Sequence, residues 1–599
     1  MATTTAPVRY EDSEVQKAHT DLYQDSSKRP LYPVLPPGLS QSEFDEAINE
    51  LVSVLGNKNV FAGEALQDYI DPYEIDEPGV ERKIPGAAVT PPTTEALQDI
   101  LRVANKHGIP LWTFSRGKNI GYGGPAPALP GSIALDLHRM DKVIEVNEKF
   151  AYAVVEPGVT FTDLYNYCVD KGLKVWPSVP SLGWGSVIGN TLDRGAGFTP
   201  TASHYEHIAG LEVVLANGDT VRTGQWAQSN SPSAHLSKFS FGPSVEGLFL
   251  QSNMGVVTKM GIWLTPQPQA YMSCSFDMPN AEDVGAICDV FGDMRRSGIL
   301  PNIAYVFNII EWSAIVGKRC ELYDKEGPMP ESRIKELQEQ IGVGHWSVKF
   351  SLYGPRAICQ AQYDEVQKIV AAQAPTGRLK GTMFSGEGDR LLDPSSVQMP
   401  HGGMFVGVPS LWSLPLTKYM LPKDESGAGA HGAYSAIIPL DGKVMNEWYD
   451  CVREVYAAEG LDAMTDFFMH HRHAVMVCML CFDKMDQKQC EAVERIFHKL
   501  YVEGKKRGFS KYRAHVNHMG RFGLSSMVRT ATDSWTDMVS QQNDWNDHAY
   551  MRFLETIKDS LDPNGVLSPG KMGVWPTKYR HMRDSKQNGH ATNGTNGDA

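Results

Sequence analysis

A glycine-rich stretch, SRGKNIGYGGPAP at residues 115–127, holds the residue types that bind a phosphate group. It contains four glycines beside Arg116 and Lys118, and it follows the apolar run IPLWTF. Glycine tolerates positive φ and lets the backbone approach a ligand, so successive N–H groups can converge on one anion. The spacing fits neither the Walker motif nor the G-x-G-x-x-G fingerprint. The stretch therefore suits a diphosphate, and the alternative is an ordinary surface turn.

Three other stretches carry residue types that do chemistry. PSLGWGSVIGNTLDRGAGF, at residues 180–198, is also glycine-rich and can bring its backbone equally close to a ligand. KYRAH supplies Tyr512 and Arg513, and GLDAMTDFFMHHRH supplies Asp466. Taken singly, each stretch also has an interpretation without a function. The glycine-rich stretch can be a turn-rich loop, the Tyr-Arg pair can be structural, and Asp466 can be a solvated carboxylate.

Metal and thiol chemistry are not expected. His470, His471 and His473 have a spacing that suits metal ligation from neither a helix nor a strand. Cys478 and Cys481 form a C-x-x-C, but they lie in the apolar run VMVCMLCF and no second pair follows. We interpret both cysteines as buried structural residues.

The composition bounds the class of protein. The chain has 599 residues, of which 42% are hydrophobic, so more than one domain or one large composite is expected. A net charge of −14 disfavours nucleic acid as a partner. The sequence has no run of 18 apolar residues that could span a membrane. We recognise neither a basic and apolar secretion leader nor a peroxisomal tripeptide. The nine scattered cysteines indicate reduced thiols. We expect a cytoplasmic protein without a membrane span.

The pattern of elements is α/β. Short strands are predicted at residues 86–91, 109–114, 132–137, 142–147 and 152–158. The segment TTEALQDILRVANKHG predicts a helix with a threonine cap and Gly108 as its stop. Asn217-Gly218 within LEVVLANGDTVRTG predicts a hairpin. Longer helical patterns follow, and the pattern as a whole indicates one domain interrupted by a second.

Together these motifs resemble the vanillyl-alcohol oxidase family of FAD enzymes, in the branch that contains 4-cresol dehydrogenase. The resemblance is carried by RGKNIGYGG, VVEPGVTFTDLYNY, GSVIGNTLDRGAGFTP, GLEVVLANGDTVRTG, QSNMGVVTKMGIWLTP, GAHGAYSAIIP and DPNGVLSPGKMGVWP. It implies an α+β, two-domain flavoenzyme with a PCMH-type (p-cresol methylhydroxylase-type) FAD-binding domain and an α/β cap domain. The FAD-binding domain is expected at 31–270 and 506–582 and the cap at 271–505, with a flexible N-terminus at 1–30 and a disordered tail at 583–599.

The resemblance also implies the residues of the site. The cofactor-binding set is Arg116, Gly117, Lys118, Asn119, Ile120, Gly121, Pro180, Gly185, Ser186, Gly189, Asn190, Gly195, Gly197, Phe198, Gly255, Val257, His431 and Lys571. Tyr122, Tyr512 and Arg513 match family residues that bind the phenolic oxygen of the substrate. Ionising a phenol near pH 7.5 costs about 3.4 kcal/mol. Hydrogen bonds to charged groups contribute roughly 1.5–3 kcal/mol each, so these three residues can offset that cost.

The implied reaction is the oxidation of a para-substituted phenol. A hydride leaves the carbon next to the ring for the flavin, and the resulting quinone methide is hydrated or deprotonated. The chain departs from the pattern in its acid/base residue: Ser181 stands where relatives carry an aspartate, and Asp466 stands where vanillyl-alcohol oxidase has a threonine. We infer that Asp466 is the acid/base, since serine without an activating partner is no base near neutral pH.

Other features of the site are also expectations from the resemblance. His431 matches a histidine that some relatives link covalently to the flavin, although the segment that carries the activating histidine is replaced by IDEPGVERK. Gly432 and Ala433, followed by Tyr434, stand where relatives carry larger groups, which indicates a roomier pocket. We expect molecular oxygen as the electron acceptor and a homodimer or higher homo-oligomer.

Two competing hypotheses remain open. One keeps the fold but changes the chemistry, to an oxidative cyclase or an alcohol dehydrogenase acting on a bulkier, secondary-metabolite-like substrate. Ser181 and Asp466, which depart from the family pattern, support this hypothesis. The intact set Tyr122, Tyr512 and Arg513 argues against it. The other is a flavin-bearing protein without activity.

Overall fold

The computed structural model describes residues 34–72, 83–399, 402–424, 426–519 and 542–588. The predictions for residues 1–30 and for most of IDEPGVERK lie outside these ranges. The tail that was predicted to be disordered from residue 583 is helical as far as Asn588, and 589–599 lie outside the description. This helix, α15 (Thr577–Asn588), is anchored in its first turn by Arg580, which pairs with Asp559. Extending an anchored helix by one residue is far easier than nucleating it.

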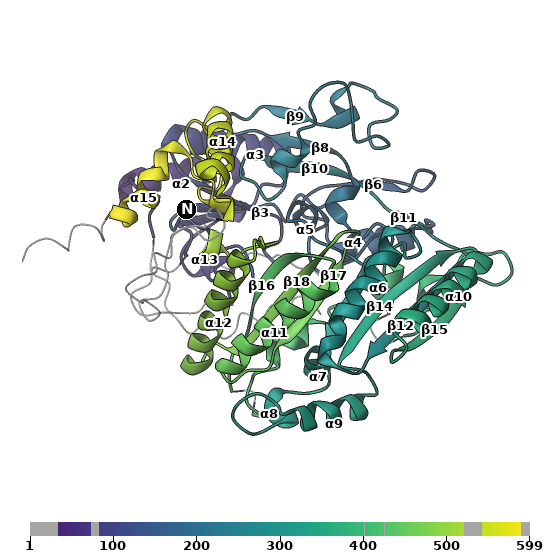
Figure 1. Ribbon diagram of the computed structural model, residues 1–599. Coiled ribbons are helices and arrows are strands. Elements are labelled where there is room, and N and C mark those ends of the chain that lie inside the picture. Colours follow the sequence, from purple (N-terminus) through teal and green to yellow (C-terminus); the bar gives the residue numbers. More distant parts are fainter. Residues whose placement is uncertain (1–33, 73–82, 400–401, 425, 520–541, 589–599) are drawn as a thin grey trace, which may run out of the picture.

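The described N-terminal part contains a four-stranded and a five-stranded sheet, besides a two-stranded pair (Figure 1). The first has the order β1 (Val60–Phe61), β2 (Ala87–Val89), β4 (Ile133–Asp136) and β3 (Leu111–Phe114), with β2, β4 and β3 parallel. The second is antiparallel, in the order β5 (Val143–Asn147), β6 (Tyr152–Val155), β10 (Val256–Trp263), β8 (Ile208–Val214) and β9 (Thr220–Arg222). Helices α2 (Gln41–Leu55) and α3 (Thr94–His107) pack on the first sheet.

Local signals set several of these elements. The Thr93 hydroxyl caps α3 by accepting a hydrogen bond from Ala96 N at 3.2 Å, and Gly108 ends the helix at φ 66°. The apolar stripe of α3 is buried against α2 and the sheet. Gly218 adopts φ 86° in the turn between β8 and β9, as the Asn-Gly pair predicts. The strands and the helix expected in this region are therefore confirmed.

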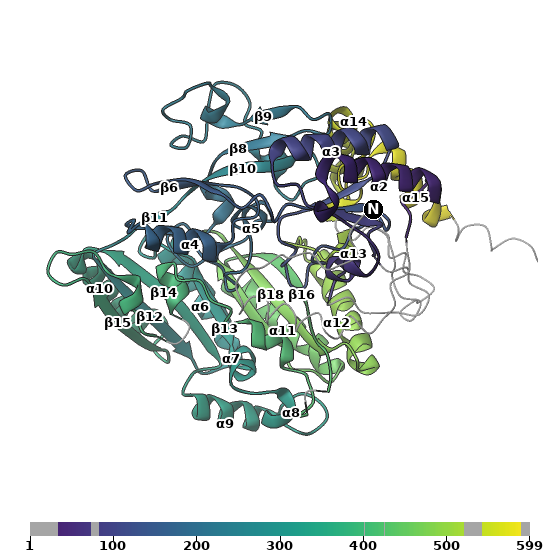
Figure 2. The ribbon, with the colours of Figure 1, turned by 180° about the vertical axis from the view of Figure 1, so that it is seen from behind.

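The cap is a seven-stranded antiparallel sheet, with helices packed on one face (Figures 1 and 2). Its order is β15 (Arg378–Ser385), β12 (Ala270–Met278), β14 (Trp346–Gly354), β13 (Ala304–Asn308), β17 (Met464–Met469), β18 (His473–Asp483) and β16 (Gly429–Pro439). The covering helices are α6 (Val284–Arg296), α10 (Arg356–Gln373), α11 (Gly442–Ala458) and α12 (Gln487–Lys506). The opposite face packs on the N-terminal part, because Tyr305 and Phe307 belong to the same hydrophobic cluster as Val155.

Shorter elements complete the two parts. Helix α4 (Phe161–Asp170) follows β6, and α5 (Val187–Leu192) lies within the second glycine-rich stretch. Helices α7 (Ile309–Val316), α8 (Arg319–Leu322) and α9 (Glu331–Ile341) lie at the lower edge of the cap in Figure 1. Cys478 and Cys481 are buried in β18 as free thiols. The remaining strands are β7 (Val175–Trp176) and β11 (Thr265–Pro266), which pair with each other.

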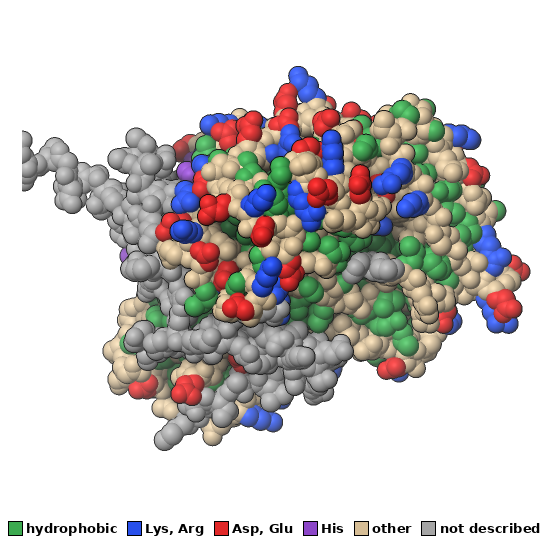
Figure 3. All heavy atoms as spheres, turned by 90° about the horizontal axis from the view of Figure 1, so that it is seen from below, with side chains coloured by type: hydrophobic (Ala, Val, Ile, Leu, Met, Phe, Trp, Pro, Cys, Tyr) green, Lys and Arg blue, Asp and Glu red, His purple; other side chains and the backbone are tan. Residues whose placement is uncertain are grey.

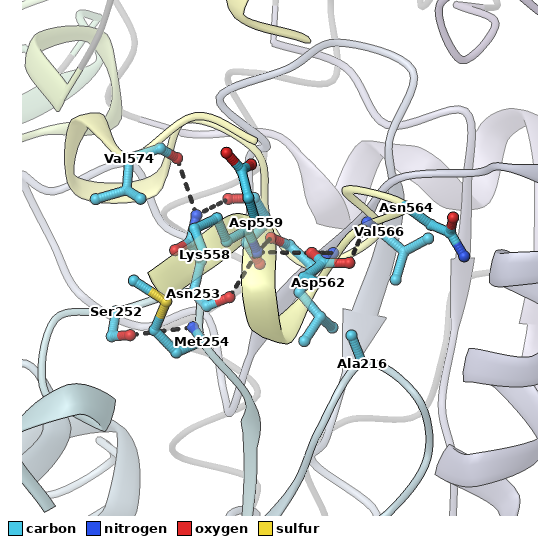
Figure 4. Close-up of polar contacts among 12 residues, drawn as sticks. Ala216, Ser252, Asn253, Met254, Lys558, Asp559, Asp562, Asn564, Val566 and Val574 are labelled. Atoms are coloured by element: carbon cyan, nitrogen blue, oxygen red, sulfur yellow. Dashed lines mark hydrogen bonds and ion pairs between the residues drawn. The ribbon is translucent and has the colours of Figure 1, made fainter. Parts of the chain in front are cut away.

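The C-terminal segment returns to the N-terminal part. Helix α14 (Trp545–Leu561) carries Lys558, whose ammonium is fully buried and lies 2.7 Å from Asp562 Oδ2 (Figure 4). Lys558 also donates to the carbonyls of Asn253 and Leu567, both at 2.7 Å. The Asp562 carboxylate accepts from Val566 N and Leu567 N. This ion pair therefore connects the end of the chain to the loop that precedes β10.

The surface of the described residues is mixed in charge. Figure 3 shows acidic and basic side chains interspersed over one face of the molecule. No helix within the described ranges is long and apolar enough to cross a bilayer.

Candidate active site

A cavity of about 420 Å³ lies where the two glycine-rich loops meet the cap sheet. This volume falls in the ordinary range of small-molecule and cofactor sites, roughly 300–1,000 Å³. The N-terminal part contributes the loop after β3, the segment around α5 and the loop before β10. The cap contributes side chains from β13, α7, β16, β17 and β18, and the chain after α12 contributes Tyr512, Arg513 and Lys571.

The first glycine-rich loop runs along the cavity, with Arg116, Gly117, Lys118, Asn119, Ile120 and Tyr122 in its lining. Its glycines are required by conformation and by space. Gly117, Gly121, Gly123 and Gly124 all have positive φ. A Cβ on Gly123 would lie 2.5 Å from Val516 Cγ1, and one on Gly121 would lie 2.6 Å from His431 Nδ1. Gly121 is thus packed against the cap, outside the lining residues.

The second glycine-rich stretch forms the adjoining wall. Ser186 caps α5: its hydroxyl accepts from Gly189 N at 2.9 Å and donates to Pro157 O at 2.6 Å. The predicted residues that line the cavity here are Pro180, Gly185, Ser186, Gly189, Asn190 and Gly195, together with Gly255 and Val257 from the start of β10. Gly197 and Phe198 are not among the lining residues. Phe198 is fully buried behind the wall, with its ring 5.6 Å from Tyr305 and 6.0 Å from Phe468.

Tyr122, Tyr512 and Arg513 meet in one place, although they come from distant parts of the chain. The Arg513 guanidinium carbon lies 5.3 Å from the Tyr122 ring centroid and 5.0 Å from that of Tyr512. The Tyr122 hydroxyl lies 3.4 Å from Ser435 Oγ. The Tyr512 hydroxyl donates to the main-chain carbonyl of Arg194.

Asp193 orients Arg513, and sequence reasoning missed it. Arg513 Nε donates to Asp193 O at 2.6 Å and lies 3.2 Å from Asp193 Oδ2. Arg513 Nη2 is buried and has no hydrogen-bond partner among the described residues. The arginine is therefore held by one nitrogen and keeps another for a ligand.

The electrostatics keep this group of residues in one protonation state. Burial raises the pKa of Tyr122 and of Tyr512, so both hydroxyls remain protonated donors at neutral pH. Burial alone would lower the pKa of Arg513, but the neighbouring Tyr512 and Asp193 raise it above its ordinary value. One fixed cation and two neutral hydroxyls favour an anionic oxygen on a ligand.

Asp466 lines the cavity from β17 and is 6% exposed. Burial raises its pKa to about 8. Two further residues lie beside it that the sequence analysis did not single out. Tyr305 on β13 places its hydroxyl 3.3 Å from Asp466 Oδ2 and 2.5 Å from Glu311 Oε1, and Glu311 on α7 is 1% exposed. A signal for Glu311 was present, because it is the lone charged residue in the apolar run IIEWSAIV.

His431 and Lys571 also line the cavity. His431 Nδ1 is buried without a hydrogen-bond partner in the described ranges, and burial lowers the pKa of His431 to about 4. The imidazole is thus neutral and nucleophilic at neutral pH. Lys571 donates to Thr113 O at 3.3 Å, and burial lowers its pKa.

Some predicted features lie elsewhere. Tyr434 points away from the cavity into the helical side of the cap, where its ring lies 5.9 Å from that of Phe497. Gly432 shares that side, because side chains alternate along β16, so only Ala433 lies on the face of His431. The roomier pocket predicted from Gly432 is therefore not supported. Ser181 does line the cavity.

The histidine run is engaged in local contacts. His470 and His473 stack at 4.5 Å, and His470 Nδ1 lies 3.2 Å from Ser203 Oγ. Within the described ranges, no group of three or more His, Cys, Asp or Glu residues could hold a metal ion.

The cavity fits the cofactor that the sequence motifs imply. Glycines with positive φ bring main-chain groups to one wall, and Arg116 and Lys118 supply positive charge beside them. His431 Nδ1 and Arg513 Nη2 are buried polar atoms that still lack a partner among the described residues. A diphosphate suits the glycine wall, and an aromatic ring system suits the space between that wall and the cap.

Comparison with known proteins defines the class. Residues 85–224 match the model of the FAD binding domain family. The structure of p-cresol methylhydroxylase (PCMH) with substrate bound superposes with a TM-score of 0.79 at 29% identity, covering 90% of this chain and 99% of that one. The chain is an FAD-dependent oxidoreductase with a PCMH-type FAD-binding fold.

Similarity over the full length defines the family. The chain is 31% identical to the 4-cresol dehydrogenase [hydroxylating] flavoprotein subunit of Pseudomonas putida, over 90% of this chain and 98% of that protein. It is 27% identical to the 1'-carboxy-chondrochloren decarboxylase of Chondromyces crocatus, over 90% of this chain and 99% of that protein. The structure of 4-ethylphenol oxidase from Gulosibacter chungangensis in its isoeugenol complex superposes with a TM-score of 0.81 at 32% identity, covering 91% of this chain and all of that one. The chain belongs to the vanillyl-alcohol oxidase / 4-cresol dehydrogenase family of FAD-dependent 4-phenol oxidases.

Proposed function

We propose that this protein oxidises para-substituted phenols by removing a hydride from the side-chain carbon attached to the ring. The observation that carries the proposal is the meeting of Tyr122, Tyr512 and Arg513 around one cavity, with Arg513 Nη2 free for a ligand among the described residues. Relatives named as a cresol dehydrogenase and an ethylphenol oxidase support it. FAD, when bound, supplies the hydride acceptor.

The three residues would hold the substrate as a phenolate. Ionisation of a phenol near pH 7.5 costs about 3.4 kcal/mol, and one charged arginine bond with two hydroxyl bonds to the anion offsets it at roughly 1.5–3 kcal/mol each. The Tyr512 hydroxyl, now on the Arg194 carbonyl, would turn to the phenolate when it binds. The negative charge then moves through the ring, which favours hydride loss from the side-chain carbon at the para position and leaves a quinone methide.

Asp466 would complete the reaction. Its carboxylate lies in the same cavity, and its Oδ1 is buried without a partner among the described residues. It would accept a proton either from the water that adds to the quinone methide or from the neighbouring carbon. The products would be an alcohol or an alkene, respectively. Because its pKa is raised, the carboxyl can hold and release a proton near neutral pH.

An anaerobic reduction experiment tests the function. The purified holoenzyme is mixed with a 4-alkylphenol in the absence of oxygen, and the flavin absorbance is followed in a stopped-flow instrument. We expect bleaching by phenols, and a loss of at least 100-fold in the reduction rate in Tyr122→Phe and Arg513→Ala with FAD still bound. Tyr152→Phe is the matched control, because it removes a tyrosine hydroxyl that bonds to Glu145 outside the cavity.

Two outcomes would contradict the proposal. Bleaching only by alcohols without a phenol would favour the alternative, an oxidative cyclase or an alcohol dehydrogenase on a bulkier substrate. A flavin that no substrate reduces would indicate a protein without this activity. Rates unchanged in both variants would refute the assignment of the phenolate site.

We further propose that molecular oxygen reoxidises the flavin and that His431 forms a covalent link to it. Similarity to 4-ethylphenol oxidase supports the first, although the cresol relative is named as the flavoprotein subunit of a dehydrogenase. The neutral, unpartnered Nδ1 of His431 supports the second. Oxygen consumption during turnover, measured with an electrode, tests the acceptor. The proposed homo-oligomer and the cytoplasmic location rest on the sequence alone.

A further inference from the structure

Two buried carboxyl groups share one tyrosine at the cap side of the cavity. The Tyr305 hydroxyl lies 2.5 Å from Glu311 Oε1 and 3.3 Å from Asp466 Oδ2. The second oxygen of each carboxyl, Glu311 Oε2 and Asp466 Oδ1, is buried and has no hydrogen-bond partner among the described residues. All three residues line the cavity. Each carboxyl therefore uses one oxygen on Tyr305 and keeps the other free.

The number of hydrogens available for hydrogen bonds limits how many of the two carboxyl groups, Glu311 and Asp466, can be ionised. A phenol hydroxyl has one hydrogen, so Tyr305 can donate to only one carboxylate at a time. If Tyr305 donates to Asp466, the contact with Glu311 needs a proton on Glu311 that is donated to Tyr305. Two buried carboxylates without a cation between them would also repel each other strongly. The arrangement therefore requires at least one proton on the pair, and one negative charge remains once Asp466 ionises.

The surroundings favour placing the proton on Glu311. Burial raises the pKa of Glu311 well above its usual range, and the Asp466 carboxylate raises it further. Glu311 lies in the N-terminal turn of α7, where the helix dipole favours a negative charge and therefore lowers the pKa of Glu311. Among the described residues, Tyr122 and Cys478 interact electrostatically with Asp466, and Cys481 interacts with Glu311. Burial raises the pKa of each of these three, so they are neutral at neutral pH.

We propose that Glu311, in its protonated form, is a positioning residue that completes a water site with Asp466. Glu311 donates to Tyr305, Tyr305 donates to Asp466 Oδ2, and Asp466 Oδ1 remains as the acceptor for a water molecule that Glu311 Oε2 also contacts. This inference rests on the proposed oxidation of phenols. It assigns to Glu311 the control of whether the quinone methide gains water or loses a proton.

The step balances as follows. The water oxygen forms a bond to the electrophilic side-chain carbon of the quinone methide. The electron pair of the exocyclic double bond returns to the ring, and the carbonyl oxygen becomes a phenolate beside Arg513. The water proton passes to Asp466 Oδ1. Glu311 and Tyr305 keep their protons, and the product is a benzylic alcohol.

The ratio of alcohol to alkene formed from 4-ethylphenol tests the proposal. In the wild type the ratio should stay level through the ionisation of Asp466, around pH 8, because its carboxylate takes the proton in both routes. The ratio should fall at higher pH, where Glu311 loses its proton and takes the Tyr305 hydrogen bond from Asp466. Glu311→Gln keeps a neutral donor, so it should lose the fall. Glu311→Leu should lower the ratio at least tenfold. Identical pH profiles in the wild type and Glu311→Gln would overturn the proposal.

A second measurement is independent of turnover. The resting holoenzyme at pH 9, above the pKa of Asp466, should show the infrared C=O stretch of a protonated carboxylic acid, and Glu311→Gln should lack it. A band that persists in Glu311→Gln would contradict the protonated state of Glu311, even if Glu311→Leu does not fold. Failure of the proposed function is distinguishable, because 4-ethylphenol would then leave the wild-type flavin oxidised.

Discussion

Replacing Arg513 with lysine should weaken the binding of a phenolate by about 10- to 150-fold. Arg513 donates from Nε to Asp193, and its Nη2 has no partner among the described residues and can donate to the ligand. A lysine has a single nitrogen with which to reach both Asp193 and the ligand. The variant therefore loses about one charge-assisted hydrogen bond, worth roughly 1.5–3 kcal/mol, and each 1.4 kcal/mol is a factor of ten in Kd. The positive charge is retained, so the effect reports on geometry.

The assay uses a phenol without a side-chain carbon, such as 4-chlorophenol, which has no hydride to lose, so that binding is measured without reaction. Titration into the oxidised holoenzyme is followed by the change in the flavin spectrum. Arg472→Lys is the matched control, because Arg472 is exposed on the turn between β17 and β18 and should leave Kd unchanged. A Kd within twofold of the wild type in Arg513→Lys, with FAD fully bound, would refute the assignment of Arg513 to the phenolate.

Two further predictions concern stability and the cofactor. Lys558→Met should destabilise the protein by about 3–5 kcal/mol, because it leaves the Asp562 carboxylate buried without its ammonium partner. Thermal unfolding measures this effect. Lys488→Met, at an exposed site, is the control and should stay within about 0.5 kcal/mol of the wild type. His431→Ala should release its FAD on acid precipitation, whereas the wild type should keep yellow flavin in the pellet; free FAD in both supernatants would exclude the covalent link.

Local elements of the fold could be predicted because their signals are local. Thr93 and Gly108 mark the ends of α3, and Asn217-Gly218 marks the turn between β8 and β9. The strand order of the cap could not be predicted from pattern alone, since β16 pairs with β18 at the sheet edge across α11 and β17. Pairing between distant strands leaves no signal in the intervening sequence.

The active site, like the fold, has some residues that the sequence predicts and others that only the structure shows. The glycine loops and Tyr122 were predictable, because long motifs carry them. Tyr512 and Arg513, in the short stretch KYRAH, were predicted from the family resemblance that those motifs establish. Asp193 was not predictable, because it acts through another side chain, Arg513. Glu311 could be noticed as the lone charge in an apolar run, but the sequence does not show that it reaches Tyr305. Such support residues have no spacing of their own, and only the folded chain shows which group each one reaches.

The pleat of the cap sheet separates the chemistry of the site from the core of the cap. Asp466 and Phe468 alternate with Phe467 on β17, and only the first two line the cavity. Phe467 belongs to the hydrophobic cluster under the helices. A shift of one residue in the pairing of β17 with β18 would exchange Asp466 for an apolar or hydroxyl side chain and bury the acid in that cluster. The register of the cap, which hydrophobic packing enforces, is thus what places the carboxylate opposite the glycine loops. Substitutions on the cavity face of the cap can therefore alter the substrate while the cofactor wall stays unchanged.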